Sequence, residues 1–85
     1  MAYFVYILHS NKGDHYYVGQ SDNPQRRLLY HNSVEKGYTA RYRPWELVYV
    51  KEFASRREAR EVEGKIKRWK NKGKIVRLIE GNIEM

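Results

Sequence analysis

The hydrophobic positions of this chain gather into three short runs that have the character of β-strands. Residues 3–8 read Tyr-Phe-Val-Tyr-Ile-Leu and are apolar at nearly every position, which is typical of a central strand buried on both faces. A polar segment with turn chemistry follows at residues 10–14, where Gly13 can adopt a positive φ. Residues 15–18 then form the partner strand of a hairpin, and an apolar run at residues 45–53 predicts a third strand.

The pairing of the first two strands decides where Tyr6 and Tyr17 lie. If the hairpin closes about residues 11 and 12, the two tyrosines face each other directly. A slip of one residue would place them on opposite faces of the sheet, because successive strand residues alternate between faces. The sequence leaves both registers open.

Between the second and third strands, residues 23–32 carry the signals of a first helix. Either of the two polar residues before Pro24 can cap its amino end, and proline suits the first turn. We expect Leu28 and Leu29 to point inward. Residues 33–44, with scattered aromatic and basic side chains, are predicted to form a loop.

A second, longer helix is predicted over residues 55–70. It starts with the capping-box sequence Ser-Arg-Arg-Glu, in which the first and last side chains can satisfy free backbone N–H groups. A short last helix at residues 74–80 is stopped by Gly81. The long helix has an apolar stripe at steps of three and four residues, made of Ala59, Val62, Ile66 and Trp69.

The order of elements, ββαβαα, defines an α+β fold in which helices flank a small three-stranded antiparallel sheet. At 85 residues the chain is expected to form one domain, residues 1–85, with a modest core. Because cysteine is absent, neither a disulfide nor a thiolate metal site is available. No apolar run reaches the length of a membrane span and the first residues lack a charged signal-peptide start, so we expect a cytoplasmic protein with no membrane partner.

The charge of the chain predicts a class of partner. Lys and Arg total 17 against 10 Asp and Glu, which gives a formal net charge of +7. So large a positive charge on a small domain favours a polyanion such as nucleic acid. The excess is concentrated between residues 41 and 74, although a basic, solvated surface without such a partner would have the same composition.

One set of residues along the first two strands and the first helix matches a known pattern. Residues 4–6 read Phe-Val-Tyr, residues 17–19 read Tyr-Val-Gly, and Arg27 and His31 follow on the helix, four residues apart and on one face. In these positions the chain resembles the GIY-YIG nuclease domain over about residues 3–70. The first glycine of that signature is absent here, whereas both tyrosines, the second glycine and the arginine spacing are present.

The resemblance implies a metal site at Glu63. This acid borders the apolar stripe of the long helix, where an acid without functional role is usually a paired surface residue. The family places its single metal-binding glutamate in this helix with basic residues just after it, as Lys65 and Lys67 are here. One carboxylate with waters and a substrate phosphate is the usual way in which Mg²⁺ is held, so the expected cofactor is a divalent cation, Mg²⁺ or Mn²⁺.

The resemblance also implies roles for the two tyrosines. Tyr17 would be the base that activates water, and Tyr6 would position the water or the phosphate. A tyrosine has an unperturbed pKa of about 10 and is a poor base at neutral pH unless nearby cations favour its phenolate. The bland alternative is that both are core strand aromatics whose hydroxyls reach water.

Arg27 and His31 complete the predicted catalytic set. The guanidinium of Arg27 offers a planar fork of donors for a phosphate that gains charge in the transition state. Its neighbour Arg26 lies 100° around the helix and should face solvent. His31 would bond a phosphate or the attacking water; the alternative is a helix-surface histidine. Many relatives have a lysine where this chain has Gln20, which can hydrogen-bond a phosphate but brings no charge.

The leading interpretation is a metal-dependent nuclease that hydrolyses DNA phosphodiester bonds, in DNA repair or recombination. The alternatives are a non-catalytic nucleic-acid-binding module that retains the fold, and an RNA-binding accessory protein of translation. The expected substrate is DNA, branched or single-stranded forms included; RNA is left open, and the oligomeric state is not predicted. The residues expected to contact nucleic acid are Gln20, Lys36, Arg41, Arg43, Arg57 and Lys67.

Overall fold

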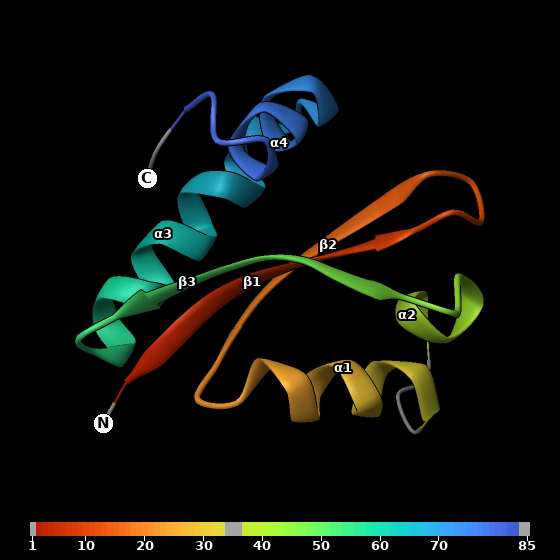
Figure 1. Ribbon diagram of the computed structural model, residues 1–85, viewed down its shortest axis with the longest axis horizontal. Helices are drawn as coiled ribbons and strands as arrows, with labels where there is room; N and C mark the ends of the chain where they lie inside the picture. Colours follow the sequence, from red (N-terminus) through yellow and green to blue (C-terminus); the bar gives the residue numbers. More distant parts are fainter. Residues whose placement is uncertain (1, 34–36, 84–85) are drawn as a thin grey trace.

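The computed structural model of the chain describes residues 2–33 and 37–83, and it confirms the predicted α+β class. In Figure 1 a central sheet has one helix beneath it and two helices above it. Among the described residues no helix has the length and apolar character needed to cross a membrane. The elements in chain order are β1 (Tyr3–Ser10), β2 (His15–Ser21), α1 (Pro24–Ser33), α2 (Tyr38–Arg41), β3 (Glu46–Phe53), α3 (Arg56–Trp69) and α4 (Lys72–Ile79).

The three strands form an antiparallel sheet in the order β2-β1-β3. The central position of β1 explains its continuous apolar sequence, since both of its faces are covered. Val5, Ile7 and Val18 pack on the side of α3 and α4, against Ala59 and Ile66. The opposite face is covered by α1 and carries a second apolar cluster, made of Tyr6, Leu8 and Trp45 with Tyr17, Leu28, Tyr42 and Leu47 around it.

The hairpin register differs from the direct pairing of the two tyrosines. Tyr6 pairs with Gly19, and Leu8 pairs with Tyr17. A four-residue turn, residues 11–14, separates the strands in place of the two-residue closure that direct pairing requires. The resulting shift is two residues, so Tyr6 and Tyr17 still share one face and lie diagonally across it.

The start of α3 follows the predicted capping signal, whereas α4 begins two residues before its predicted start because Asn71 caps it. The Ser55 side chain accepts a hydrogen bond from the Glu58 backbone N–H at 3.2 Å, which confirms a cap at the start of α3. The predicted stripe faces the core, where Ala59 and Ile66 are fully buried. Lys70, whose backbone adopts the left-handed αL conformation, ends α3, and α4 begins two residues later.

Two expectations about the region around α1 are wrong. Leu28 packs in the second cluster, but Leu29 is 68% exposed. Adjacent helical residues point about 100° apart, so the inward position after Leu28 falls three residues on, at His31, which is fully buried. The other error is α2, a single short helix within the stretch that was predicted to be a loop. Four residues are too few to show a helical period.

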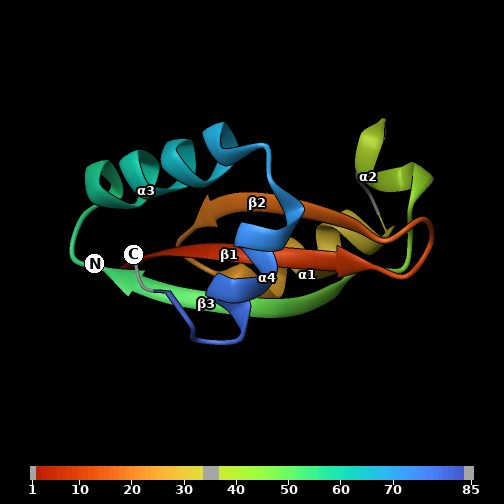
Figure 2. The same cartoon turned by 90° about the horizontal axis from the view of Figure 1, so that it is seen from above.

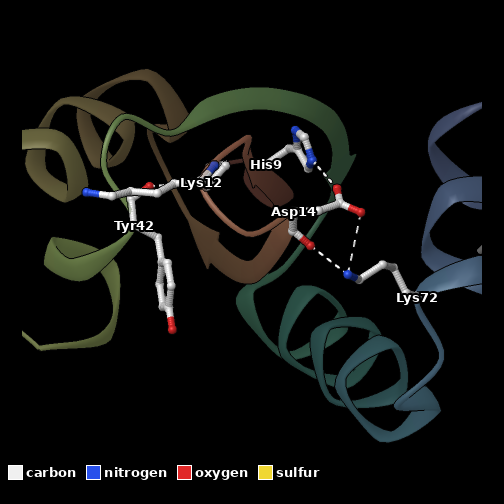
Figure 3. A network of polar contacts seen from close by, with 6 residues as sticks. His9, Lys12, Asp14, Tyr42 and Lys72 are labelled. Atoms are coloured by element: carbon white, nitrogen blue, oxygen red, sulfur yellow. Dashed lines mark hydrogen bonds and ion pairs between the residues drawn. The ribbon is translucent and has the colours of Figure 1, made fainter.

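The β1–β2 turn is tied to the start of α4 by polar contacts (Figure 3). His9 Nε2 and Asp14 Oδ1 are 2.6 Å apart. Lys72 donates from Nζ to the Asp14 backbone carbonyl at 2.7 Å, and the same nitrogen is 3.5 Å from the carboxylate. Asp14 thus connects two segments that are far apart in sequence and fixes the end of the hairpin.

Candidate active site

Tyr6 is at the centre of the site, and Gly19 gives it room. The Tyr6 side chain, which is almost fully buried, lies across β2 at the residue with which it pairs. A Cβ atom at position 19 would come within 2.5 Å of the Tyr6 hydroxyl oxygen. Any side chain there would therefore displace the ring, which is the physical reason for glycine at this place in the second signature element.

His31 reaches the tyrosines from α1. Its Nε2 lies 3.1 Å from the Tyr6 hydroxyl oxygen, within hydrogen-bond distance. Its ring centroid is 4.7 Å from that of Tyr17 and 6.2 Å from that of Tyr6. The side chain is fully buried, so the alternative of a helix-surface histidine is wrong.

Arg27 lies one helical turn before His31 and enters the same site. Its side chain hydrogen-bonds the Tyr6 hydroxyl, and its guanidinium carbon is 4.7 Å from the centroid of the Tyr30 ring. Arg26 faces solvent, as predicted: its side chain is 69% exposed, and its Nη2 lies 3.5 Å from Asp22 Oδ1. The two neighbouring arginines therefore have different environments, and one of them belongs to the site.

Burial raises the pKa of Tyr6 above the usual tyrosine value. The hydrogen bond from Arg27 acts in the opposite direction, whereas the nearby Tyr17 and Glu63 raise the pKa further because their anionic forms would repel a phenolate. Tyr6 is therefore a neutral hydroxyl at physiological pH. Such a group can accept from Arg27 while donating its own proton to a neutral His31 Nε2.

Tyr17 lies between α1 and α3 and is half-buried. Its ring centroid is 6.5 Å from that of Tyr6 and 6.3 Å from that of Trp45. On the α3 side, the Lys67 ammonium is 5.9 Å from the Tyr17 ring centroid. Tyr17 therefore has aromatic neighbours on one side, a cation on the other, and partial access to solvent.

Glu63 reaches the site although α3 packs mainly on the other face of the sheet. Figure 2 shows that α3 runs alongside β2, an edge strand, so side chains of α3 can pass that edge. The Glu63 side chain is only 18% exposed and is close enough to influence Tyr6 electrostatically. Lys67 Nζ lies 3.0 Å from its Oε2. No group of three or more His, Cys, Asp or Glu residues suited to a metal occurs in the described part of the chain.

The family model described as the GIY-YIG catalytic domain matches residues 2–76. The chain belongs to the GIY-YIG family. A UPF0213 protein of Bacillus pumilus is 37% identical over 83 residues, covering 96% of this chain and 84% of that protein. The solution NMR structure of a UPF0213 protein from Bacillus halodurans superposes with a TM-score of 0.54 at 29% identity, covering 87% of this chain and 79% of that one.

Other relatives are much longer than this chain. The structure-specific endonuclease subunit SLX1 of Podospora anserina is 44% identical over 68 residues. The match covers 72% of this chain but 20% of that protein. The slx1 subunit of Aspergillus fumigatus is 43% identical, and the match covers 16% of its length. The chain therefore matches about a fifth or less of these endonuclease subunits.

The GIY-YIG fold brings five predicted residues together and leaves others apart. Tyr6, Tyr17, Arg27, His31 and Glu63 converge as described above. Strand alternation places Gln20 on the face of Val5 and Val18, opposite that of Tyr17, so it is not part of this cluster. Lys36 lies outside the described residues.

The other arginines predicted to contact nucleic acid differ in their exposure and in their contacts within the protein. Arg41 is exposed at the end of α2, and Arg57 is exposed on α3, 3.4 Å from Glu61. Arg43 donates from Nε to the His31 backbone carbonyl at 2.8 Å, so it also supports the helix that carries His31. Their role in nucleic-acid binding stays a prediction.

Asn32 has a positioning role that the sequence did not reveal. Its Oδ1 accepts from the Trp45 backbone N–H at 2.6 Å, and its Nδ2 donates to the Trp45 carbonyl at 3.1 Å. This pair of bonds fastens the end of α1 to the start of β3, next to His31. The available signal was weak, because an asparagine near a helix end usually indicates only that the helix stops.

Proposed function

We propose that this protein is a divalent-metal-dependent endonuclease that hydrolyses DNA phosphodiester bonds. The observation that carries the proposal is the convergence of Tyr6, Tyr17, Arg27, His31 and Glu63 from two strands and two helices. A surface that only binds nucleic acid needs cations, but it gains nothing from a carboxylate beside a phosphate. Relatives named structure-specific endonuclease subunits support DNA as the substrate.

The chemistry of Glu63 fits a hard divalent cation. Its carboxylate is partly shielded from solvent, yet still reachable, and a single carboxylate suits Mg²⁺ or Mn²⁺ when waters and a substrate phosphate fill the other positions. When bound, the ion would polarise the phosphate and stabilise the leaving oxygen. Glu63 is the residue that would hold it.

The roles of the other residues follow from their environments. Tyr17, which is partly exposed and borders a cation, is the general base that takes a proton from the attacking water. Tyr6, kept neutral by burial, orients Arg27 and His31 through its hydroxyl. Arg27 offers its donors to the phosphate as charge develops there.

Substrate binding is electrostatic in this proposal. The net charge of +7 attracts the DNA backbone, and exposed cations such as Arg41 and Arg57 contact phosphates. Branched or single-stranded DNA is the preferred substrate class, consistent with a role in repair or recombination. The names of the SLX1 relatives, structure-specific endonuclease subunits, support a substrate that is recognised by its structure.

A non-catalytic nucleic-acid-binding module is the second candidate. One observation favours it: Glu63 is paired with Lys67, whose Nζ lies 3.0 Å from the carboxylate, instead of being open to a metal. The same fold and charge would then serve binding alone.

Incubation of the purified protein with plasmid, single-stranded and branched DNA separates the two candidates. Each substrate is tested with Mg²⁺, with Mn²⁺ and with EDTA. The nuclease proposal expects cleavage that requires the metal. DNA binding without cleavage of any substrate in either metal would favour the binding module.

A further inference from the structure

Lys67 contacts Glu63, the proposed metal ligand, and lies near Tyr17, the proposed base. Its Nζ is 3.0 Å from Glu63 Oε2 and 5.9 Å from the centroid of the Tyr17 ring. The spacing of four residues along α3 produces the ion pair with Glu63. The Lys67 ammonium therefore lies beside the Glu63 carboxylate, in the place where a bound divalent cation would lie.

The two members of this pair differ in exposure. The Glu63 side chain is 18% exposed, and that of Lys67 is 52% exposed. A lysine ammonium on a flexible four-carbon stem can leave a half-exposed pair at little cost. Glu63 is held near the tyrosines by its burial, so Lys67 is the partner that can move.

An ammonium and a divalent cation compete for the same carboxylate. Both are positive, and they repel each other when held a few ångströms apart. A divalent ion therefore binds Glu63 well only after Lys67 has turned away. A phosphate of DNA in the site is the anion that can accept the released ammonium, because it arrives next to Tyr17 and carries its own charge.

We propose that Lys67 is a displaceable internal counter-ion that makes metal binding at Glu63 depend on DNA. In the free protein it neutralises Glu63; when DNA enters, it transfers to a phosphate and opens the carboxylate to the metal. This inference rests on the proposed function, because it takes Glu63 as the metal ligand. It adds the regulation of that site: metal and DNA each strengthen the binding of the other.

The test uses Lys67→Met, which removes the charge and keeps most of the stem. Mn²⁺ binding to the full chain without DNA is measured by titration calorimetry. We expect the variant to bind Mn²⁺ roughly five- to tenfold more tightly than the wild type, the size of a typical coupling between sites. Lys65→Met is the matched control, since Lys65 is an exposed lysine on the same helix and points in a different direction; it should leave Mn²⁺ binding unchanged.

DNA binding supplies the opposite readout. In EDTA, Lys67→Met should bind a short DNA duplex more weakly, and its slope of log affinity against log salt should be less negative by about 0.9, which is the loss of one phosphate contact. A variant that binds Mn²⁺ more tightly and DNA more weakly is the result expected of a counter-ion shared by the two ligands. A purely structural role for Lys67 would weaken both, which would overturn the inference.

Glu63→Gln distinguishes failure of this inference from failure of the proposed function. If Glu63→Gln removes Mn²⁺ binding but Lys67→Met does not strengthen it, the counter-ion inference is wrong and the metal site stands. If Glu63→Gln leaves Mn²⁺ binding unchanged in both the wild-type and Lys67→Met backgrounds, Glu63 is not the ligand and both proposals are overturned.

Discussion

The two tyrosines of the site have different surroundings, and in the proposed reaction this difference gives chemically identical side chains different roles. Burial raises the pKa of Tyr6, whose hydroxyl is already engaged with Arg27 and His31. Tyr17 is partly exposed and borders the Lys67 ammonium. A proton acceptor must be reachable by water, so the tyrosine on β2 is the better base.

Tyr17→Phe tests this assignment. The change removes only the hydroxyl, so folding and DNA binding should remain near wild-type while cleavage falls about 10²–10⁴-fold, the usual contribution of a general base. A near-normal rate in Tyr17→Phe would assign the base to another group.

Gly19→Ala tests the packing of the signature glycine against Tyr6. A Cβ would lie within 2.5 Å of the Tyr6 hydroxyl oxygen, and such overpacking costs about 1–3 kcal/mol. Gly64→Ala is the control, because Gly64 lies within α3 and its Cβ would come no closer than 3.4 Å to the end of the flexible Arg68 side chain. Alanine should stabilise that helix by about 0.5–1 kcal/mol. Urea unfolding should show opposite signs for the two variants; equal effects would contradict the packing argument.

At the scale of elements, much of the architecture could be predicted from local patterns. The unbroken apolar run of residues 3–8 predicted a central strand, and the cap at Ser55 predicted the start of α3. The hairpin register could not be predicted, because a shift of two residues keeps every side chain on its face and the turn length then decides between such registers. The burial of His31 was missed because a polar residue gives no hydrophobic signal for facing inward.

The ion pair between Lys67 and Glu63 could not be predicted from the sequence either. Lys67 was expected to contact nucleic acid, and the spacing to Glu63 permits an ion pair, but many such spacings on a helix remain unpaired. The course of α3 along the β2 edge brings Lys67 beside Tyr17, where it is paired with Glu63.

The contacts between the β1–β2 turn and α4 should make stability depend on acid pH. The hydrogen bond with His9, aided by Lys72, lowers the pKa of Asp14 below its ordinary value of 3.8. A carboxyl group with a lowered pKa in the folded state stabilises the protein above its ordinary pKa, and this contribution is lost as pH falls through the lowered value.

Asp14→Asn is the matching variant, since asparagine also tolerates the positive φ of 52° at this position. Thermal unfolding at neutral pH should show a lower Tm for the variant. The difference should shrink once the pH is well below 3.8. A difference that stays constant over this range would mean that the charge of Asp14 does not stabilise the fold.

At the scale of the whole molecule, the net charge of +7 predicts that the proposed binding of DNA weakens as the salt concentration rises. Each phosphate contact on duplex DNA contributes about −0.9 to the slope of log affinity against log salt. Removing one contact, by Arg41→Gln or Arg57→Gln, should make the slope less negative by about this amount. Fluorescence anisotropy over a salt series measures it, and an affinity that does not change with salt would argue against a polyanion partner.

The most direct test of the nuclease proposal is the cleavage of branched DNA in Mg²⁺ by the wild type, Glu63→Gln and Glu61→Gln. Glu61 is the matched control, an exposed glutamate on the same helix that lies 3.4 Å from Arg57. We expect Glu61→Gln to cleave like the wild type. Glu63→Gln should lose cleavage by orders of magnitude, because several kcal/mol of transition-state stabilisation disappear with the ion, while its DNA binding in EDTA stays equal or becomes tighter. Equal cleavage by all three proteins would contradict the proposal that Glu63 holds the catalytic metal.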